Sequence, residues 1–359
     1  MKDLQMKSTN GLGRLAPGMK LKTHLLSAVG WLGVAASAFA QTNFTRVMDS
    51  APINAMTNGC GGVAWADYDN DGYLDLFVAD LGMNNHLLHN QRDGTFAPVT
   101  KGDIVNEGPA ECYGVAWGDY NNDGYPDLFV ANGYNSGKTN FLYLNKGDGT
   151  FTKISNGPVV NIQGYFVSGA WADFDRDGFL DLFVASWNDP TASGTSLLFH
   201  NNRDGTFTQT NSAVSIHSIA LVGAWADYDN DGWPDLFVAN GWGFEDAANF
   251  LYRNHADGTF TRTLAPNFVS ASRSSVCAAW GDYDNDGFLD AFVANDSEGN
   301  ELYHNNGNGS FTRITTGAIV ADTADSISAA WGDYDNDGWL DLFVGNRNPG
   351  DGSPARGFL

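Results

Sequence analysis

Asp67-Tyr68-Asp69-Asn70-Asp71-Gly72-Tyr73-Leu74-Asp75 is the stretch that decides the fold, because the chain repeats its pattern six times. Each copy has the form Asp-x-Asp/Asn-x-Asp-Gly-x-x-Asp, and successive copies begin 51 to 55 residues apart. A fixed period of roughly this size indicates a protein built from repeated structural units. The six copies, loops 1 to 6, occupy residues 67–75, 119–127, 173–181, 227–235, 282–290 and 333–341.

The spacing of the acidic residues within each loop predicts a cation site. Side chains at positions 1, 3 and 5 of a tight loop can turn inward together, and glycine at position 6 allows a bend with positive φ. Position 7 can add a backbone carbonyl and position 9 a further carboxylate. Such a donor set suits Ca²⁺, which takes about six to eight oxygen ligands, better than Mg²⁺, which tends to keep its water. We therefore expect up to six Ca²⁺ ions.

The expected ligands, with position 7 contributing through its carbonyl, are Asp67, Asp69, Asp71, Tyr73 and Asp75; Asp119, Asn121, Asp123, Tyr125 and Asp127; Asp173, Asp175, Asp177, Phe179 and Asp181; Asp227, Asp229, Asp231, Trp233 and Asp235; Asp282, Asp284, Asp286, Phe288 and Asp290; and Asp333, Asp335, Asp337, Trp339 and Asp341.

Two other kinds of loop share part of this pattern. A helical Ca²⁺ loop needs Glu at position 12 between helices, but position 12 of loop 1 is Val78 and the flanking runs 63–66 and 76–79 are typical of strands. Metal-free Asp-Gly turns would account for one Asp and one Gly. They would not account for several carboxylates at fixed spacing, which repel one another without a cation. Loop 2 is the weaker copy because it carries Asn121, and Arg176 in loop 3 is expected to point outward.

The unit Ala-Trp-Ala-Asp-Tyr-Asp-Asn-Asp-Gly-Tyr-Leu-Asp-Leu-Phe-Val-Ala, followed by Asn-x-x-Asp-Gly-Thr-Phe, resembles the FG-GAP/VCBS repeat. This repeat builds the head domains of integrin α chains and many secreted bacterial proteins. The resemblance runs from about residue 42 to the last residue. It implies a β-propeller with Ca²⁺ in the loop between the first two strands of each blade. It says less about function, because the family is functionally broad.

Each repeat contains four segments of strand length, which in the first repeat are residues 62–66, 76–79, 86–90 and 95–99. An Asp-Gly or Asn-Gly turn separates the last two in most repeats, which favours a hairpin. A four-stranded unit repeated radially is a propeller blade. The fold class is therefore all-β, a β-propeller with its cation loops between the first two strands of each blade.

The number of blades depends on how the propeller closes. Residues 43–47 resemble a fourth strand that lacks the other three, and the sixth repeat stops at 357–359, where its third strand should begin. The simplest interpretation is that residues 43–47 complete the last of six blades. A truncated chain lacking a seventh blade or a further domain is the alternative.

Aromatic residues recur at two positions of the repeat, one just before the loop (Trp65 and its equivalents) and one at its second position (Tyr68 and its equivalents). We expect them to pack between blades rather than to bind sugar, because every repeat has them. His89, His200 and His304 also share one repeat position, so we interpret them as structural.

The N-terminal residues 1–40 have the features of a leader. Basic residues at 20 and 22 precede an apolar run at 25–36, and Ala38-Phe39-Ala40 forms a cleavage signal. A membrane anchor is the alternative, although the run is short for a span of about 20 residues. We expect residues 41–359 to form the mature propeller, secreted, periplasmic or at the cell surface. In such compartments a disulfide between Cys60 and Cys112 is possible, but small buried cysteines are favoured slightly.

The formal net charge of −23 comes largely from the loops and argues against a nucleic-acid partner, since no basic stripe is present to meet phosphates. The sequence has no nucleophile and base at a familiar catalytic spacing. We expect a monomeric extracellular binding or adhesion module for protein or glycan ligands; the alternative is a propeller enzyme, a lyase or hydrolase, acting on polysaccharide. Candidate ligand residues in the variable connections are Glu107, Glu111, Tyr134, Trp187, His217, Trp242, Phe244, Glu245, Asp246 and Arg273.

Overall fold

The computed structural model describes residues 60–108, 110–133, 138–187, 195–210, 212–214, 219–241, 247–263, 269, 272–296, 298–321, 324–347 and 357–358. The expected leader at 1–40 and the expected closing strand at 43–47 lie outside these residues.

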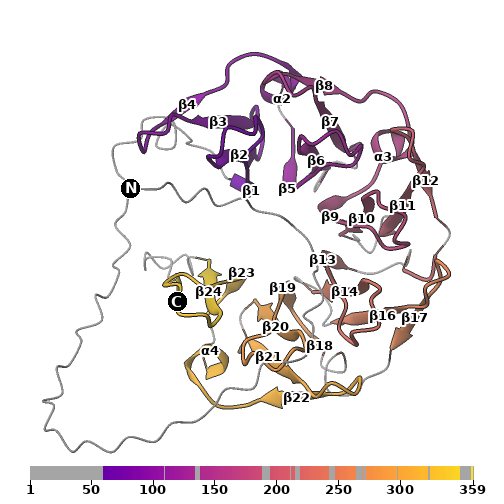
Figure 1. Ribbon diagram of the computed structural model, residues 1–359, viewed down its shortest axis with the longest axis vertical. Coiled ribbons are helices and arrows are strands. Elements are labelled where there is room, and N and C mark those ends of the chain that lie inside the picture. Colours follow the sequence, from indigo (N-terminus) through magenta and orange to yellow (C-terminus); the bar gives the residue numbers. More distant parts are fainter. Residues whose placement is uncertain are drawn as a thin grey trace, which may run out of the picture. The chain divides into compact units, whose positions relative to one another are not determined.

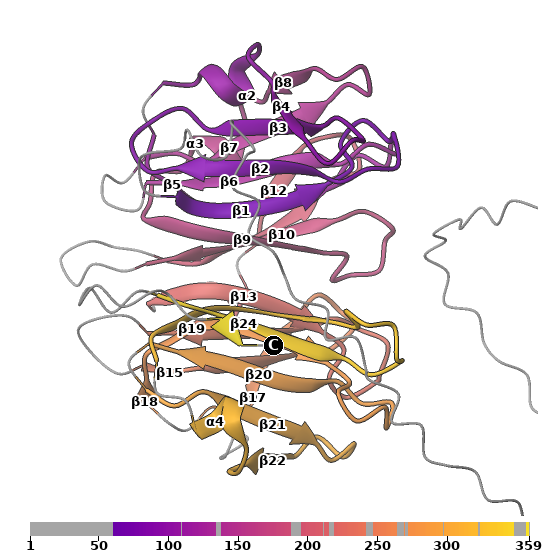
Figure 2. The ribbon, with the colours of Figure 1, turned by 90° about the vertical axis from the view of Figure 1, so that its left-hand side faces the viewer.

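The first repeat folds into a sheet of four antiparallel strands, β1 (Cys60–Ala66), β2 (Asp75–Asp80), β3 (His86–Asn90) and β4 (Phe96–Pro98). The strands pair in chain order, and Figure 2 shows β2 between β1 and β3. The strand predicted at 86–90 has the bounds of β3, whereas the other three predicted strands differ from β1, β2 and β4 by one or two residues. The last acidic residue of the loop is therefore already the first residue of the second strand.

Four further repeats form the same four-stranded sheet, and the sixth forms three strands of it. The strands are β5 (Cys112–Gly118), β6 (Asp127–Asn132), β7 (Phe141–Asn145) and β8 (Phe151–Lys153) in blade 2; β9 (Phe166–Ala172), β10 (Asp181–Ser186), β11 (Leu197–Asn201) and β12 (Phe207–Gln209) in blade 3; β13 (Ala220–Ala226), β14 (Asp235–Asn240), β16 (Phe250–Asn254) and β17 (Phe260–Thr263) in blade 4; β19 (Ser275–Gly281), β20 (Asp290–Asn295), β21 (Glu301–Asn305) and β22 (Phe311–Ile314) in blade 5; and β23 (Ser326–Gly332), β24 (Asp341–Asn346) and β25 (Gly357–Phe358) in blade 6.

The first strand of each blade packs against the first strand of the next, and Figure 1 shows the blades following one another in chain order. The predicted class, an all-β propeller with four-stranded blades, is confirmed. A small extra sheet pairs β15 (Ala247–Ala248) with β18 (Ser272–Arg273). No helix in the described part of the chain has the length and apolar character needed to cross a membrane.

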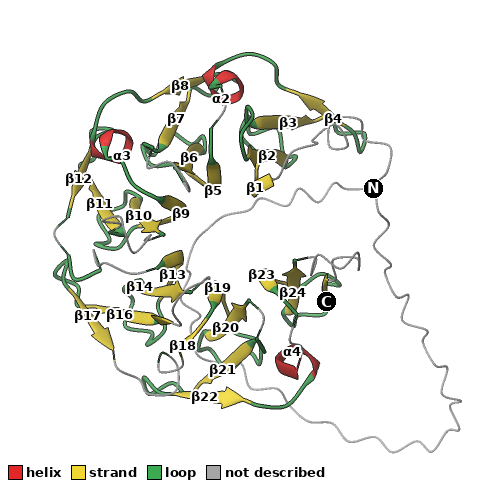
Figure 3. Ribbon diagram, turned by 180° about the vertical axis from the view of Figure 1, so that it is seen from behind, coloured by secondary structure: helices red, strands yellow, loops and turns green. Residues whose placement is uncertain are grey.

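Three one-turn helices were not predicted: α2 (Asp103–Asn106), α3 (Pro158–Asn161) and α4 (Ala318–Ala321). Figure 3 shows α2 beside β8 and α3 beside β12, so these two helices contact the outer strand of the following blade. They bury two apolar residues each there, such as Ile104 and Val105 in α2. A single turn is too short for helical periodicity to reveal it in the sequence.

The hydrophobic core lies between blades rather than within them. In five blades the second strand is buried along its whole length, which explains its uninterrupted apolar run. Phe77 and Leu87 of blade 1, for example, share one cluster with Leu128 and Tyr143 of blade 2. A blade therefore needs a neighbour to bury its faces, as expected of a repeat protein.

Trp171 shows how neighbouring blades fit together. Its indole lies parallel to the ring of Tyr120 (11° between planes, 6.1 Å between centroids) and edge-on to Phe129 (86°, 6.4 Å), and Nε1–H donates to the Ala116 carbonyl at 3.2 Å. The same bond joins Trp117 to Ala64, Trp225 to Ala170, Trp280 to Ala224 and Trp331 to Ala279. The packing role predicted for these tryptophans fits this arrangement.

Within the described residues, the first and sixth blades each carry large apolar side chains that are about half exposed. Trp65 of blade 1 is 52% exposed, and Phe343 of blade 6, the equivalent of Phe77, is 49% exposed. The third strand of blade 6, β25, lies at 357–358, where it was expected to begin. It pairs with Val344 and Gly345 of β24.

Candidate metal loops

The six acidic stretches lie where they were expected, between the first and second strands of each blade. In loop 1, Asn70 at position 4 has φ 57° and Gly72 at position 6 has φ 90°, and the equivalent residues of the other loops have nearly the same values. Two positive φ angles so close together turn the chain sharply, and asparagine and glycine adopt them at the lowest cost. The six loops therefore share one backbone conformation.

The acid at position 1 fixes this conformation. In loop 1 Asp67 accepts the N–H of Asp71 with Oδ1 (2.9 Å) and the N–H of Gly72 with Oδ2 (2.8 Å). Asp71 at position 5 in turn accepts the N–H of Tyr73 at 2.8 Å. Both arrangements recur in all six loops. Backbone N–H groups thus orient these carboxylates without a metal.

The acid at position 9 is buried in loops 1 to 5. Asp127 and Asp181 have no exposed surface, and Oδ1 of each accepts the N–H of an asparagine at the end of the third strand (Asn145 and Asn201, both 2.8 Å). Burial raises the pKa of Asp127 to about 7 and the pKa of Asp181 to about 8. Burial likewise raises the pKa of Asp235 to about 8. A cation nearby would stabilise these buried carboxylates as anions.

The donors at positions 1, 3 and 9 converge. In loop 1 Asp67, Asp69 and Asp75 each offer a carboxylate oxygen within 4.8 Å of the others, and loop 3 repeats the arrangement. Oδ1 of Asp69 and Oδ1 of Asp284 are buried atoms that have no hydrogen-bond partner. Buried oxygen donors without a proton donor fit a hard divalent cation such as Ca²⁺. The carbonyl ligand at position 7 stays a prediction.

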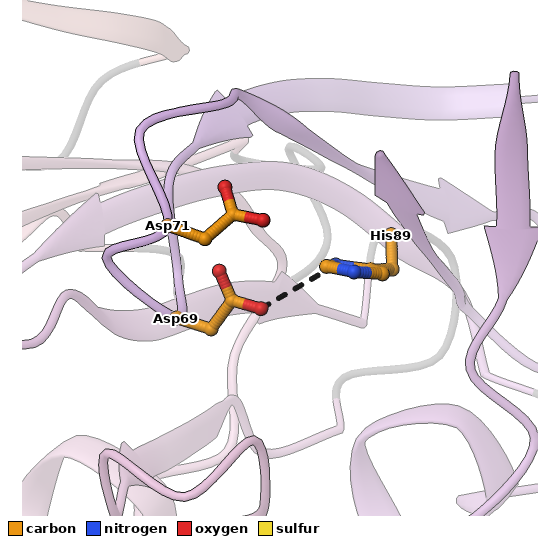
Figure 4. A group of neighbouring side chains, drawn as sticks. All are labelled: Asp69, Asp71 and His89. Carbon is orange, nitrogen blue, oxygen red and sulfur yellow. Dashed lines mark ion pairs between the residues drawn. The ribbon is translucent and has the colours of Figure 1, made fainter. Parts of the chain in front are cut away.

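Sequence reasoning missed the contribution of the third strand to the loops. Its fourth residue, which precedes the recurring asparagine, lies beside the carboxylates. In loop 1 this residue is His89, and Figure 4 shows its imidazole facing Asp69 and Asp71 across the loop. Aligning the repeats at the asparagine shows that the equivalent residues are Leu144, His200, Arg253 and His304 in blades 2 to 5.

The loops differ in which basic side chains contact their carboxylates. Arg253 places Nε 2.9 Å from Asp229 Oδ2 and a terminal nitrogen 3.1 Å from Asp231 Oδ2, where it would compete with a cation for both carboxylates of loop 4. In loop 1, Arg92 from the turn after β3 contacts Asp71 Oδ2 at 2.7 Å. Arg203 does the same to Asp177 in loop 3. The acidic pattern is therefore common to all loops, but the counter-charge is not.

Neighbouring loops are joined by the asparagine at position 4. Asn70 Nδ2 donates to the carbonyl of Gly124 in loop 2 at 2.8 Å, and Asn122 donates to Gly178 in loop 3 at 2.7 Å. Asn230 and Asn285 join loops 4, 5 and 6 in the same way. Arg176 stands at this position in loop 3, and its guanidinium lies over the ring of Trp233, 5.4 Å from the centroid. The side chain of Arg176, which was expected to point outward from loop 3, therefore contacts loop 4.

The residue at position 2 is held by the following blade. Asn145 Nδ2 in blade 2 donates to the Tyr68 carbonyl at 2.7 Å. The equivalent bonds join Asn201 to Tyr120, Asn254 to Phe174 and Asn305 to Tyr228, each at 2.7 Å. Loop geometry and blade packing are therefore coupled.

Four of the candidate ligand residues, Glu107, Glu111, Trp187 and Arg273, lie in the described structure. Glu107 forms an ion pair with Lys153 and accepts a hydrogen bond from Tyr143, while Arg273 pairs with Glu298 and Glu301. Trp187 packs against the core between blades 3 and 4. Tyr134, His217, Trp242, Phe244, Glu245 and Asp246 lie outside the described residues.

Cys60, Cys112 and Cys277 are free thiols, so the possible bridge between the first two is not formed. Cys112 is buried, as the favoured interpretation requires, but Cys60 is exposed.

Comparison with known proteins agrees with this architecture. The sequence model of the FG-GAP-like repeat matches residues 67–130, 119–184, 173–238, 227–293 and 282–344. Cartilage acidic protein 1 of Xenopus tropicalis is 29% identical over 65% of this chain, and integrin alpha-7 of Mus musculus is 31% identical over 41% of it. The matched part spans 38% and 14% of those relatives. An Agrocybe aegerita lectin that recognises non-reducing terminal N-acetylglucosamine has a similar fold, with TM-score 0.56, 19% identity and coverage of 84% of this chain and 80% of that one.

Proposed function

This chain belongs to the FG-GAP-like repeat family, and on that premise we propose that it is a secreted, Ca²⁺-binding module that binds an extracellular protein or glycan. The observation that carries the proposal is the convergence of carboxylates in the loops, with one buried acid in each of blades 1 to 5. The cartilage protein and the integrin subunit among its relatives support an extracellular role. The lectin supports the fold, and its sugar is a starting point for a ligand screen.

Ca²⁺ would act on stability through the carboxylates that repel one another in its absence. Sites of extracellular type have Kd values of about 10⁻⁴ M, so about 1 mM Ca²⁺ contributes roughly 1.4 kcal/mol per site. Up to six such sites would contribute at most roughly 8 kcal/mol, comparable with the whole stability of a domain. We therefore expect EDTA to lower the melting temperature by more than about 10 °C. Bound calcium is counted by elemental analysis after dialysis, and an unchanged melting temperature would contradict the proposal.

Loop 2 offers a sharper test because Leu144 leaves it without a basic neighbour from the third strand. Asn121→Asp gives it the full set of acids found in the other loops. We expect tighter Ca²⁺ binding at loop 2 and a less stable protein in EDTA, because a fourth carboxylate then lacks a counter-charge. Asp103→Asn in α2 is the control for a general charge effect, since Asp103 is exposed and distant in sequence from the loops. Calorimetric titration measures the affinity.

The binding role is tested on glycan and extracellular-matrix protein arrays, with and without EDTA, followed by analysis of any glycan that binds. We expect binding that requires Ca²⁺ and leaves the glycan intact. Shortened or unsaturated products would instead indicate a polysaccharide hydrolase or lyase, and binding that persists in EDTA would separate the ligand site from the loops.

A further inference from the structure

We propose that one end of blade 1 is a metal site of a different kind, in which the side chains of Cys60, Asp80 and His86 bind a transition-metal ion of the Zn²⁺ class. The three residues come from β1, β2 and β3, which are neighbours in one sheet. The site shares no residue with the acidic loops. The inference goes beyond the proposed function and does not depend on Ca²⁺ in the loops.

Strand pairing brings the three side chains to one end of that sheet. Cys60 pairs with Asp80, and His86 pairs with Val78, two residues before Asp80. Residues two apart in a strand point to the same face of a sheet, and residues paired directly across two strands have neighbouring side chains. The thiol, the carboxylate and the imidazole therefore share one face, at the end of β2 opposite loop 1.

The carboxylate of Asp80 is the observation that points to a ligand. Only 5% of this side chain is exposed, and its Oδ1 is a buried atom that has no hydrogen-bond partner in the described structure. Oδ2 lies 3.6 Å from His86 Nε2, which is too far for a hydrogen bond. Buried polar atoms are normally paired, so a cation would complete the surroundings of this carboxylate.

The separation of these two atoms suits a shared metal ion. Nitrogen and oxygen ligands held about 2.0–2.2 Å from a tetrahedral ion lie roughly 3.4 Å apart. This value is close to the 3.6 Å between His86 Nε2 and Asp80 Oδ2. A metal between them would replace a weak ion pair with two coordinate bonds.

Equivalent residues of other blades show that the side chain at position 60 can reach Asp80. Blade 5 has Ser275 and Asn295 at these paired positions, and their Oγ and Oδ1 atoms lie 2.8 Å apart. The equivalent pair in blade 6 repeats the contact at 2.7 Å. Cys60 Sγ instead lies 3.4 Å from the Gly62 carbonyl, so metal binding requires the thiol to exchange this weak bond for a metal ligand bond. The carboxylate already acts on it, because partial burial raises the pKa of Cys60 and the charge of Asp80 raises it further.

Asn85 holds Asp80 in place from the next blade. Its Oδ1 accepts the N–H of Asp80 at 3.1 Å, and its Nδ2 donates to Cys112 Sγ in blade 2 at 3.4 Å. Cys112 is buried, and this bond occupies its sulfur. We therefore give Cys112 a packing role and do not count it among the ligands.

The choice of metal follows from the donor types. Thiolate and imidazole suit Zn²⁺ or copper, whereas Ca²⁺ takes oxygen ligands. One thiolate and one carboxylate would balance the two positive charges of Zn²⁺. Cys60 is exposed and 37% of the His86 side chain is exposed, so the fourth position of a tetrahedral ion would be open to water.

Blades 2 to 5 lack this combination of donors. Their residues at the three positions are Cys112, Asn132 and Phe141 in blade 2; Phe166, Ser186 and Leu197 in blade 3; Ala220, Asn240 and Phe250 in blade 4; and Ser275, Asn295 and Glu301 in blade 5. Each donor of blade 1 can therefore be replaced by a residue that the same fold accepts in another blade.

The test is a calorimetric titration of the reduced, chelator-stripped, full-length protein with Zn²⁺ in saturating Ca²⁺, which keeps the loops occupied. We expect one tight equivalent, and Co²⁺ in place of Zn²⁺ should show a sulfur-to-metal charge-transfer band. Cys60→Ser, Asp80→Asn and His86→Phe each introduce the residue of another blade. Each should weaken binding by more than about 100-fold, beyond the loss typical of an outer-shell residue.

Two controls and a second measurement accompany the titration. Cys277→Ala and His255→Ala remove a thiol and an imidazole elsewhere in the chain and should leave the equivalent unchanged. Cys60 is exposed, so its alkylation by iodoacetamide can be followed by peptide mass spectrometry. Zn²⁺ should slow this reaction in the wild-type protein but not in Asp80→Asn.

Zn²⁺ that binds equally to the wild-type protein and the three variants would be held by the loops or adventitiously, and would overturn the inference. A cobalt spectrum without the sulfur band, or alkylation of wild-type Cys60 that Zn²⁺ does not slow, would also overturn it. Calcium binding measured on the same samples keeps the two proposals apart, because its retention would leave the proposed function standing.

Discussion

Trp171 and Trp65 occupy the same position of the repeat but meet different surroundings. Trp171 packs on Tyr120 and Phe129 of the preceding blade and donates a hydrogen bond to Ala116. Trp65 has no preceding blade in the described part of the chain, contacts Phe96 of its own blade, and is 52% exposed. The comparison shows that the contribution of a repeated residue to stability depends on whether a neighbouring blade packs against it.

The largest effect is expected when the two tryptophans are each replaced by alanine. Trp171→Ala should cost about 3 kcal/mol, the lower end of the range for large aromatic residues, because its edge is partly exposed. Trp65→Ala should cost less than about 1 kcal/mol, as exposed residues usually do. Chemical denaturation of both variants in Ca²⁺ measures the difference. Equal losses would contradict the comparison and would support the closed propeller expected from residues 43–47.

A smaller effect is expected at the asparagine that ends the third strand. Asn201 is buried and donates to Tyr120 of the preceding blade (2.7 Å) and to Leu180 of its own (3.0 Å), whereas Asn90 donates to Leu74 of its own blade (3.0 Å). Asn201→Ala should therefore cost about 1–3 kcal/mol more than Asn90→Ala, because it leaves a buried carbonyl unpaired. The free energies of unfolding of the two variants give the value of the bond between blades. A difference near zero would mean that water replaces the amide.

The smallest effect is expected at position 4 of the loops. Asn122 donates to Gly178 of the next loop at 2.7 Å on an exposed surface, and Asn336 is its equivalent in loop 6. Both have nearly the same positive φ, 59° and 58°, so the strain introduced by alanine cancels when the two variants are compared. The remaining difference should be about 0.5 kcal/mol, the net value of one exposed hydrogen bond. Thermal unfolding in Ca²⁺ measures it, and a larger cost at Asn336 would contradict the scheme.

The sequence was sufficient for the repeat, the loop positions and the class of fold. The third strand at 86–90 was predicted to the residue, because a turn with Asp93-Gly94 follows it and apolar residues define it. The one-turn helices such as α2 left no periodic signal. Closure of the propeller depends on residues 43–47, which lie outside the described residues.

The candidate site was predicted in part. The acids at positions 1, 3 and 9 come together in loops 1 and 3 as their spacing indicates. The roles of His89 and Arg253 were missed because they lie 14 and 18 residues after the last acid of their loops and reach them through strand pairing. A local motif describes the donors within the loop, whereas the register of the third strand decides which side chain faces them.

The asparagine links between loops have a consequence for how ions would fill the protein. Asn70 and Asn122 join loops 1 to 3, and Asn230 and Asn285 join loops 4 to 6. At Arg176 this series of side-chain hydrogen bonds is interrupted, because the guanidinium contacts the ring of Trp233 instead. Ordering of one loop by an ion can thus pass to its neighbours within each trio. Loops 3 and 4 are joined instead by the contact of Arg176 with Trp233 and by the hydrogen bond from Asn254 to Phe174, so we expect the two trios to be coupled through aromatic packing rather than through loop-to-loop asparagine bonds.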